Sequence, residues 1–178
     1  MIKITNKIIK SADNHSLPYL QFEPENNTSN KSIILVYEIF GLTDHIKNVA
    51  KEYAENGFLV AIPDIFSRLD NNIDLPYNKD GFSKGLHLKN KLGWELPVMD
   101  IVALAANLRL ECDVSVLGYC YGGSLAWLAM QKSFIFEKGI CYYGSSIPEF
   151  LESNVNCPSM LHFGKKDKGI PSLSIEKV

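Results

Sequence analysis

The sequence predicts an α/β fold, with a doubly wound, mostly parallel sheet that carries helices on both faces. Short apolar segments alternate with helical patterns along most of the 178 residues, as in strands joined by crossover helices. Residues 32–37 contain the run Ile-Ile-Leu-Val, which is typical of a strand buried on both faces of a parallel sheet. A chain of this length buries roughly 70% of its unfolded surface, so we assign residues 1–178 to a single domain.

The N-terminal part of the chain predicts a β-hairpin. Residues 2–9 alternate between apolar and polar side chains and indicate an edge strand. Residues 13–15, Asp-Asn-His, form the turn, and residues 17–22 form the second strand. The polar residues 23–31 are expected to be a loop.

A helix is predicted after the first buried strand, at residues 44–56, where apolar side chains recur at helical spacing. Asp44 is its expected N-cap and Gly57 its expected C′ residue. Residues 67–91 are polar and contain Asn, Asp, Gly and Pro, so they predict a long loop. The remaining elements are expected at residues 58–62 (strand), 94–110 (helix), 114–117 (strand), 123 onward (helix), 138–143 (strand) and 159–163 (strand).

A Gly-x-Cys-x-Gly motif lies between the strand at residues 114–117 and the helix that follows. Its central residue is Cys120, flanked by Gly118 and Gly122. A nucleophile on a tight strand-to-helix turn has this signature, because small residues two positions away relieve crowding. The alternative interpretation is that Cys120 is a small buried apolar residue.

Two further polar residues share the expected position of Cys120 in the sheet. Glu38 follows the first parallel strand and Asp167 follows the last. Ligands of such sheets bind at the carboxyl ends of the strands. Glu38, Cys120 and Asp167 are therefore candidate site residues.

Composition and charge restrict the partners of the chain. The formal net charge of −2 gives no bulk attraction to nucleic acid or to an anionic membrane. No 18-residue apolar run or signal peptide is present. The four cysteines lack the CxxC spacing of a zinc site. We expect free thiols in the cytoplasm, no metal or organic cofactor, and a small-molecule partner.

Five segments in order resemble the dienelactone hydrolase family, from about residue 32 to the end. They are Glu38-Ile-Phe-Gly-Leu-Thr-Asp-His-Ile, Gly57-Phe-Leu-Val-Ala-Ile-Pro-Asp-Ile-Phe, Gly118-Tyr-Cys-Tyr-Gly-Gly, Tyr142-Tyr-Gly and His162-Phe-Gly-Lys-Lys-Asp-Lys-Gly-Ile-Pro. The resemblance implies an α/β-hydrolase fold that hydrolyses small esters or lactones, as carboxymethylenebutenolidases do. It also implies a domain that lacks the last strand and helix of the fold.

The resemblance assigns roles to individual residues. It implies that Cys120 is the nucleophile and Asp167 the triad acid. It places the oxyanion hole at the backbone N–H groups of Tyr121 and Ile39. Glu38 matches a glutamate that interacts with the resting thiol and is displaced when substrate binds.

The triad histidine of this fold follows the acid in the chain, and residues 168–178 contain no histidine. Activity is therefore expected to be low or absent. The alternative function is a non-catalytic fragment or degenerate homologue with a binding or assembly role, which self-associates through uncovered sheet surface. A glutaminase-like amidohydrolase fits less well, because Glu176 comes without a neighbouring histidine.

Overall fold

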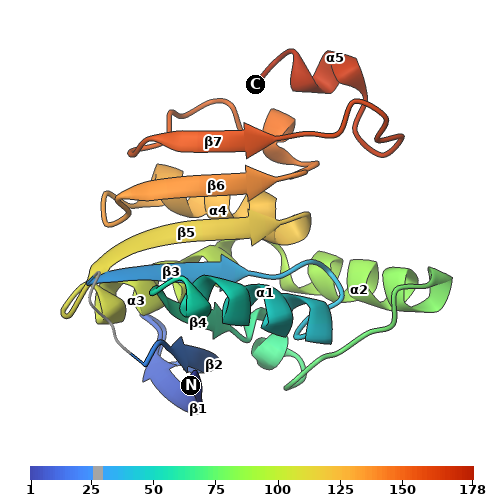
Figure 1. Cartoon of the computed structure of the whole chain (residues 1–178). Helices are drawn as coiled ribbons and strands as arrows, with labels where there is room; N and C mark the ends of the chain where they lie inside the picture. The colour runs from blue at the N-terminus through green and yellow to red at the C-terminus, as the bar shows by residue number, and fades with distance from the viewer. Residues whose placement is uncertain (26–29) are drawn as a thin grey trace.

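The computed structural model describes residues 1–25 and 30–178 and contains one seven-stranded sheet in the order β1-β2-β4-β3-β5-β6-β7 (Figure 1). The strands are β1 Lys3–Lys10, β2 Ser16–Glu23, β3 Lys31–Val36, β4 Leu59–Pro63, β5 Asp113–Tyr119, β6 Lys138–Tyr142 and β7 Ser159–His162. The helices are α1 Asp44–Glu55, α2 Lys79–Leu92, α3 Glu95–Leu108, α4 Tyr121–Lys132 and α5 Ser172–Ile175. Two 3₁₀ turns, η1 Ile65–Arg68 and η2 Ile147–Glu149, complete the set.

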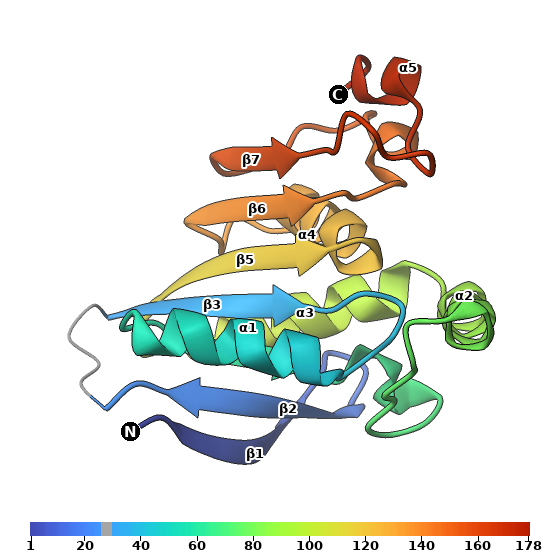
Figure 2. The same cartoon turned by 45° about the vertical axis from the view of Figure 1, so that its right-hand side comes forward.

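The sheet is parallel from β4 through β3, β5 and β6 to β7, and the β1–β2 hairpin joins it antiparallel through β4. Helix α1 covers one face, and α3 and α4 cover the other (Figure 2). The doubly wound α/β fold and the N-terminal hairpin are thereby confirmed. Part of the loop expected at residues 23–31 lies outside the described residues.

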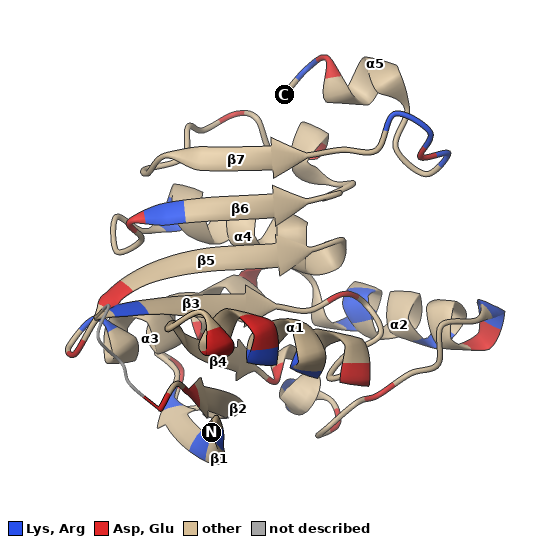
Figure 3. Cartoon of the chain, in the orientation of Figure 1, with Lys and Arg blue, Asp and Glu red and all other residues tan. Residues whose placement is uncertain are grey.

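The central strands carry the core. Residues 33–36 of β3 and all of β4 are buried, as the apolar runs predict. Charged residues lie at the starts of β3, β5 and β6, on β1, on the helices and in the loop after β7 (Figure 3). No helix within residues 1–25 and 30–178 is long and apolar enough to cross a membrane.

The N-cap of α1 is Thr43, so the expectation of Asp44 was wrong by one residue. Thr43 has extended backbone angles, φ −69° and ψ 160°, and its side-chain oxygen accepts a hydrogen bond from the Ile46 N–H. Asp44 is the first helical residue, where its negative charge favours the helix N-terminus. Gly57 follows the helix at φ +89°, as expected of a C′ glycine.

The loop expected at residues 67–91 was wrong, because it contains α2. Asn78 caps this helix by accepting a hydrogen bond from the Gly81 N–H at 2.9 Å. A Cβ on Gly85 would lie 2.3 Å from the Ile39 carbonyl oxygen. Helix α2 is largely exposed and uses glycine where its backbone meets the loop after β3, so its sequence lacks the usual apolar helical pattern.

Helix α4 begins at Tyr121, two residues before the expected position. The turn between β5 and α4 is therefore as short as one residue, Cys120. Such a short turn constrains the backbone of that residue strongly.

A buried ion pair anchors the N-terminal hairpin to the rest of the domain. Arg68 donates to both carboxylate oxygens of Asp100 at 2.8 Å, and its other side contacts Asp13 in the hairpin turn at 2.7 Å. Asp100 is fully buried and also accepts from the Ser11 hydroxyl. Each charge therefore has a partner, as burial requires.

Candidate active site

Cys120 lies between β5 and α4 in the left-handed region of backbone space, with φ 54° and ψ −116°. A residue other than glycine rarely adopts positive φ, and such strain is concentrated at functional sites. The Cys120 N–H donates to the Tyr142 carbonyl at 2.9 Å, which ties the turn to the neighbouring strand β6. The strand–turn–helix setting predicted for Cys120 is therefore present.

The glycines on either side of Cys120 allow this turn to pack. A Cβ on Gly118 would lie 2.0 Å from the Gly122 carbonyl oxygen, and a Cβ on Gly122 would lie 2.2 Å from that of Val36. Both distances are shorter than any real Cβ contact, so the two positions require glycine. The predicted reason for these glycines is confirmed.

A cavity of about 90 Å³ opens at Cys120. Its walls include Ile39 from the loop after β3 and Tyr121 from the start of α4. The structure thus brings together three residues, Cys120, Ile39 and Tyr121, that the sequence singled out. All three lie at the carboxyl ends of parallel strands, where ligands of such sheets bind.

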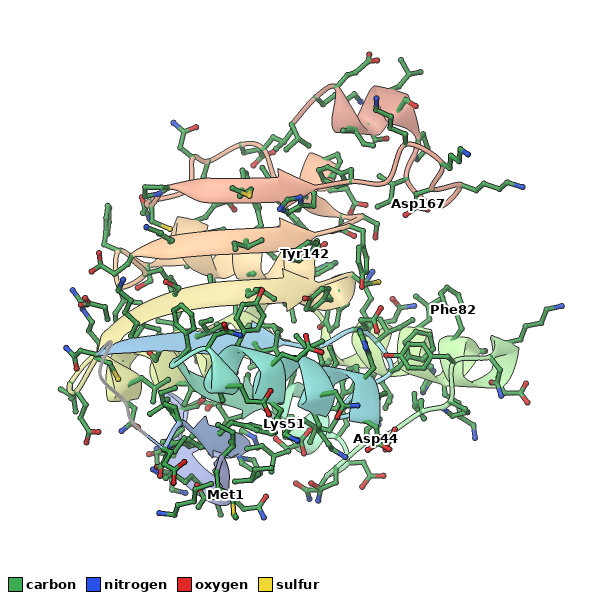
Figure 4. The ribbon with its side chains drawn as sticks, viewed as in Figure 1. Met1, Asp44, Lys51, Phe82, Tyr142 and Asp167 are labelled. Atoms are coloured by element: carbon green, nitrogen blue, oxygen red, sulfur yellow. The ribbon has the colours of Figure 1, made fainter. Side chains whose placement is uncertain are left out.

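Helix α2 supplies the opposite wall of the cavity. Phe82, Leu86 and Lys89 project from it, and Trp94 follows it. Figure 4 shows the Phe82 side chain on α2, beyond the carboxyl ends of the strands. The sequence interpretation missed the three residues of α2 because it placed them in a loop, although the Asn78 cap was an available signal for a helix. Trp94 was expected at the start of the helix at residues 94–110 but was not assigned to the site.

The two backbone N–H groups assigned to the oxyanion hole have different surroundings. Tyr121 is the first residue of α4, and its N–H is hydrogen bonded to the Cys120 thiol. Ile39 is buried, and its N–H donates to no other residue in the described part of the chain. Both residues line the Cys120 cavity, and neither N–H donates to a backbone carbonyl in the described part of the chain.

Glu38 is held by two tyrosines. One carboxylate oxygen accepts from the Tyr77 hydroxyl at 2.7 Å, and the other accepts from the Tyr143 hydroxyl at 3.3 Å. Burial, together with the Glu38 carboxylate, raises the pKa of Tyr77 to about 12. Over the described residues Glu38 makes no hydrogen bond to the Cys120 thiol.

Asp167 lies in the loop after β7, outside the walls of the cavity. It is exposed, and its Oδ1 accepts from the Gly169 N–H at 2.7 Å. Figure 4 places it at the same end of the sheet as Tyr142 and Phe82. Asp167 therefore shares the site's end of the sheet but does not contact Cys120.

The surroundings of the Cys120 thiol favour its protonated form. Burial raises the pKa of Cys120, and the charges of Glu38 and Asp167 raise it further. The Tyr121 N–H and the positive charge of Lys89 act in the opposite direction. The net direction is upward, so the resting thiol is largely protonated at neutral pH.

Among the described residues, no histidine lines the Cys120 cavity. His15 lies at the N-terminal hairpin, His45 on α1, His87 on the exposed face of α2, and His162 on β7, where its ring stacks on Tyr142 at 4.6 Å. None of these positions provides a base for the thiol. Nor do three His, Cys, Asp or Glu side chains of the described residues gather as a metal site would require.

Comparisons with known proteins agree with this architecture. The family model described as the dienelactone hydrolase family matches residues 18–178. The chain is 25% identical over 162 residues to a candidate carboxymethylenebutenolidase from Synechocystis sp., covering 82% of this chain and 65% of that protein. It is 25% identical over 173 residues to the carboxymethylenebutenolidase of Pseudomonas putida, covering 93% of this chain and 72% of that protein.

Solved structures share the fold. A candidate dienelactone hydrolase from Klebsiella pneumoniae superposes with a TM-score of 0.80 at 22% identity, covering 99% of this chain and 78% of that one. This likeness extends over the whole sheet and shows an α/β-hydrolase fold. With the family model matching most of its length, the chain belongs to the dienelactone hydrolase family.

Proposed function

We propose that this chain hydrolyses small esters or lactones, with Cys120 as the nucleophile. The main observation that supports this proposal is the strained turn at Cys120, which opens into a cavity also lined by Ile39 and Tyr121. The names of the relatives, which include carboxymethylenebutenolidase, support this class of substrate. The chain spans 65% of the length of the Synechocystis relative and 72% of that of the Pseudomonas putida relative. The activity is therefore proposed from the site in this chain, and the activities of the longer relatives are not transferred to it.

The proposed reaction has two steps. The Cys120 thiol loses its proton to solvent, and the sulfur adds to the carbonyl carbon while the carbonyl oxygen becomes negative. The N–H groups of Tyr121 and Ile39 stabilise that charge. The C–O bond then breaks, and the leaving alkoxide takes a proton from water. Water finally adds to the thioester, which releases the carboxylic acid and restores the thiol.

The proposed site has acidic residues but lacks a base. In the family pattern Asp167 would orient a histidine, and Glu38 would interact with the resting thiol until substrate displaces it. No imidazole lines the cavity of the described structure. Loss of one triad member typically lowers kcat by on the order of 10⁴-fold. We therefore expect slow turnover from this chain.

We also propose that the chain works in the cytoplasm, where thiols stay reduced. All four cysteines are free thiols, and Cys112 and Cys141 are buried. This arrangement agrees with residence where thiols remain reduced.

The test is hydrolysis of an aryl acetate by the chain and two variants. Cys120→Ala should reduce the rate to that of buffer. Cys157→Ala, which removes a half-buried thiol elsewhere, should leave the rate unchanged. Equal rates for the chain and for Cys120→Ala would remove Cys120 from the mechanism.

The absence of an imidazole from the described cavity also supports a second candidate, a non-catalytic binding domain. This candidate predicts no turnover, although an aryl ester would still acylate or label Cys120 selectively. Intact-protein mass spectrometry distinguishes the two. One stable acyl group on Cys120 without released acid favours binding, whereas continuous release of acid favours hydrolysis.

A further inference from the structure

The cavity at Cys120 contains one cation that the mechanism above does not use. Lys89 lies in the last turn of α2 and is half-buried. It lines the same cavity of about 90 Å³ as Cys120. A charge on one wall of so small a cavity influences ionisable groups on the other walls.

Aromatic rings hold the ammonium group of Lys89 in place. Its Nζ lies 4.8 Å from the centroid of the Trp94 ring and 5.8 Å from that of Tyr121. Cations are attracted to ring faces at these distances. The C-terminal end of α2 favours a positive charge as well, so the side chain has two reasons to remain at the cavity.

Lys89 also lacks a competing anion. It forms no ion pair with any side chain of residues 1–25 and 30–178. A half-buried ammonium group without a carboxylate partner can interact with another negative charge that develops nearby. One group that becomes negative in the proposed chemistry and lines the same cavity is the sulfur of Cys120.

We propose that Lys89 is the cationic partner of Cys120 and stabilises its thiolate. The inference rests on the proposed role of Cys120 as nucleophile. Lys89 would then partly supply the positive charge that an imidazolium supplies in a cysteine–histidine pair. The direction in which Lys89 acts on the pKa of Cys120, downward, agrees with this role.

Other groups around the thiol must be included in any pH profile. They are Glu38 after β3, Tyr121 at the start of α4, Tyr143 after β6 and Asp167 after β7. Glu38 and Asp167 oppose thiolate formation. Lys89 carries the positive charge that acts on the thiol. Its removal leaves the charges of Glu38 and Asp167, which oppose formation of the thiolate.

The test measures alkylation of Cys120 by iodoacetamide between pH 6 and 10, with the modified peptide quantified by mass spectrometry. The reagent is neutral, so Lys89 does not attract it. Lys89→Gln should raise the midpoint of the profile and slow alkylation at pH 7 by about 3- to 10-fold. Lys89→Arg retains the charge and should stay within about twofold of the unmodified chain.

Lys91→Gln is the matched control, because Lys91 is an exposed lysine on the same helix; its profile should be unchanged. An unchanged profile for Lys89→Gln, with a normal melting temperature, would overturn the proposal. So would an effect confined to KM for negatively charged esters, which would assign Lys89 to substrate binding. The alkylation readout does not require turnover, so it remains informative if Cys120→Ala shows that no hydrolysis occurs.

Discussion

At the scale of single residues, the site depends on backbone contacts that only glycine permits. Cys120 adopts positive φ, and the chain stabilises this conformation by letting β5, α4 and β3 approach one another at Gly118 and Gly122. The strain at one residue is thus balanced by close packing of its neighbours. Any side chain at either glycine must move a strand or a helix.

Gly122→Ala should destabilise the domain. The new methyl group would lie 2.2 Å from the Val36 oxygen and 2.5 Å from the Tyr37 oxygen, both of them backbone atoms that cannot rotate away. Overpacking of this kind typically costs about 1–3 kcal/mol. Urea denaturation measures the change in unfolding free energy.

Gly164→Ala is the control for this prediction, because its Cβ would meet nothing closer than 3.7 Å. It should change the unfolding free energy by less than about 0.5 kcal/mol. Similar losses for the two variants would contradict the packing explanation.

At the scale of elements, the N-terminal hairpin joins the domain through the pairing of β2 with β4, and an ion pair at its turn adds a charged contact. Arg68 in η1 joins Asp100 in α3 to Asp13 in the hairpin turn. The side-chain hydrogen bond from Arg68 is the main cause that lowers the pKa of Asp13 to about 2. Because Asp13 is exposed, its ion pair contributes little to the free energy of unfolding at neutral pH. The lowered pKa mainly affects how stability changes with pH.

Stability should fall in acid as Asp13 is protonated. A depressed native pKa means that the stabilisation is present above the unfolded value of about 3.9. It is lost as the pH falls toward about 2. Asp13→Asn should therefore show a smaller loss of thermal stability between pH 5 and pH 2 than the unmodified chain, measured by circular dichroism.

Asp44→Asn serves as a comparison for the acid prediction, since Asp44 is exposed and forms an ion pair with Lys47 at 3.6 Å within its own helix. Its pH profile should follow that of the unmodified chain. A parallel profile for Asp13→Asn would show that the Arg68 contact does not control acid unfolding.

Helix α2 is the element on which the composition of the cavity depends. It contributes Phe82, Leu86 and Lys89, and Gly85 lets it approach the loop of Ile39. Because a Cβ on Gly85 would lie 2.3 Å from the Ile39 carbonyl oxygen, the backbone of α2 packs closely on the loop of Ile39, and the positions of the two segments are coupled. A change in α2 therefore affects the cavity and the proposed oxyanion hole together.

At the scale of the whole molecule, the sheet is covered unequally. Helix α1 lies in front of β3 and β4, whereas no helix of the described part of the chain lies in front of β6 and β7 (Figure 1). On that face Tyr119, Tyr142 and His162 form a ladder of stacked rings, 4.8 Å and 4.6 Å apart. Strand β7 is the last strand of the sheet that residues 1–25 and 30–178 form, and Met160 on it is 56% exposed.

We propose that this surface promotes self-association of a single cooperative domain formed by residues 1–178. An unpaired strand edge beside exposed apolar side chains favours pairing with another chain. Sedimentation velocity should show a mass that rises with concentration, and Met160→Lys should reduce that rise. Leu110→Lys, which changes an apolar side chain that is 83% exposed elsewhere, should not. A monomer at every concentration, with one cooperative melt, would contradict association while supporting the single domain.

The sequence by itself determined the features that depend on local pattern. Apolar runs predicted the buried strands β3 and β4, and the Gly-x-Cys-x-Gly spacing predicted the turn at Cys120, because strand burial and turn crowding leave direct signatures within a few residues. Tertiary structure alone decided the wall formed by α2, the tyrosines that hold Glu38, and the placement of Lys89 over Trp94. Those features arise where segments far apart in the chain meet. An exposed helix with internal glycines has no apolar pattern from which such a contact could be predicted.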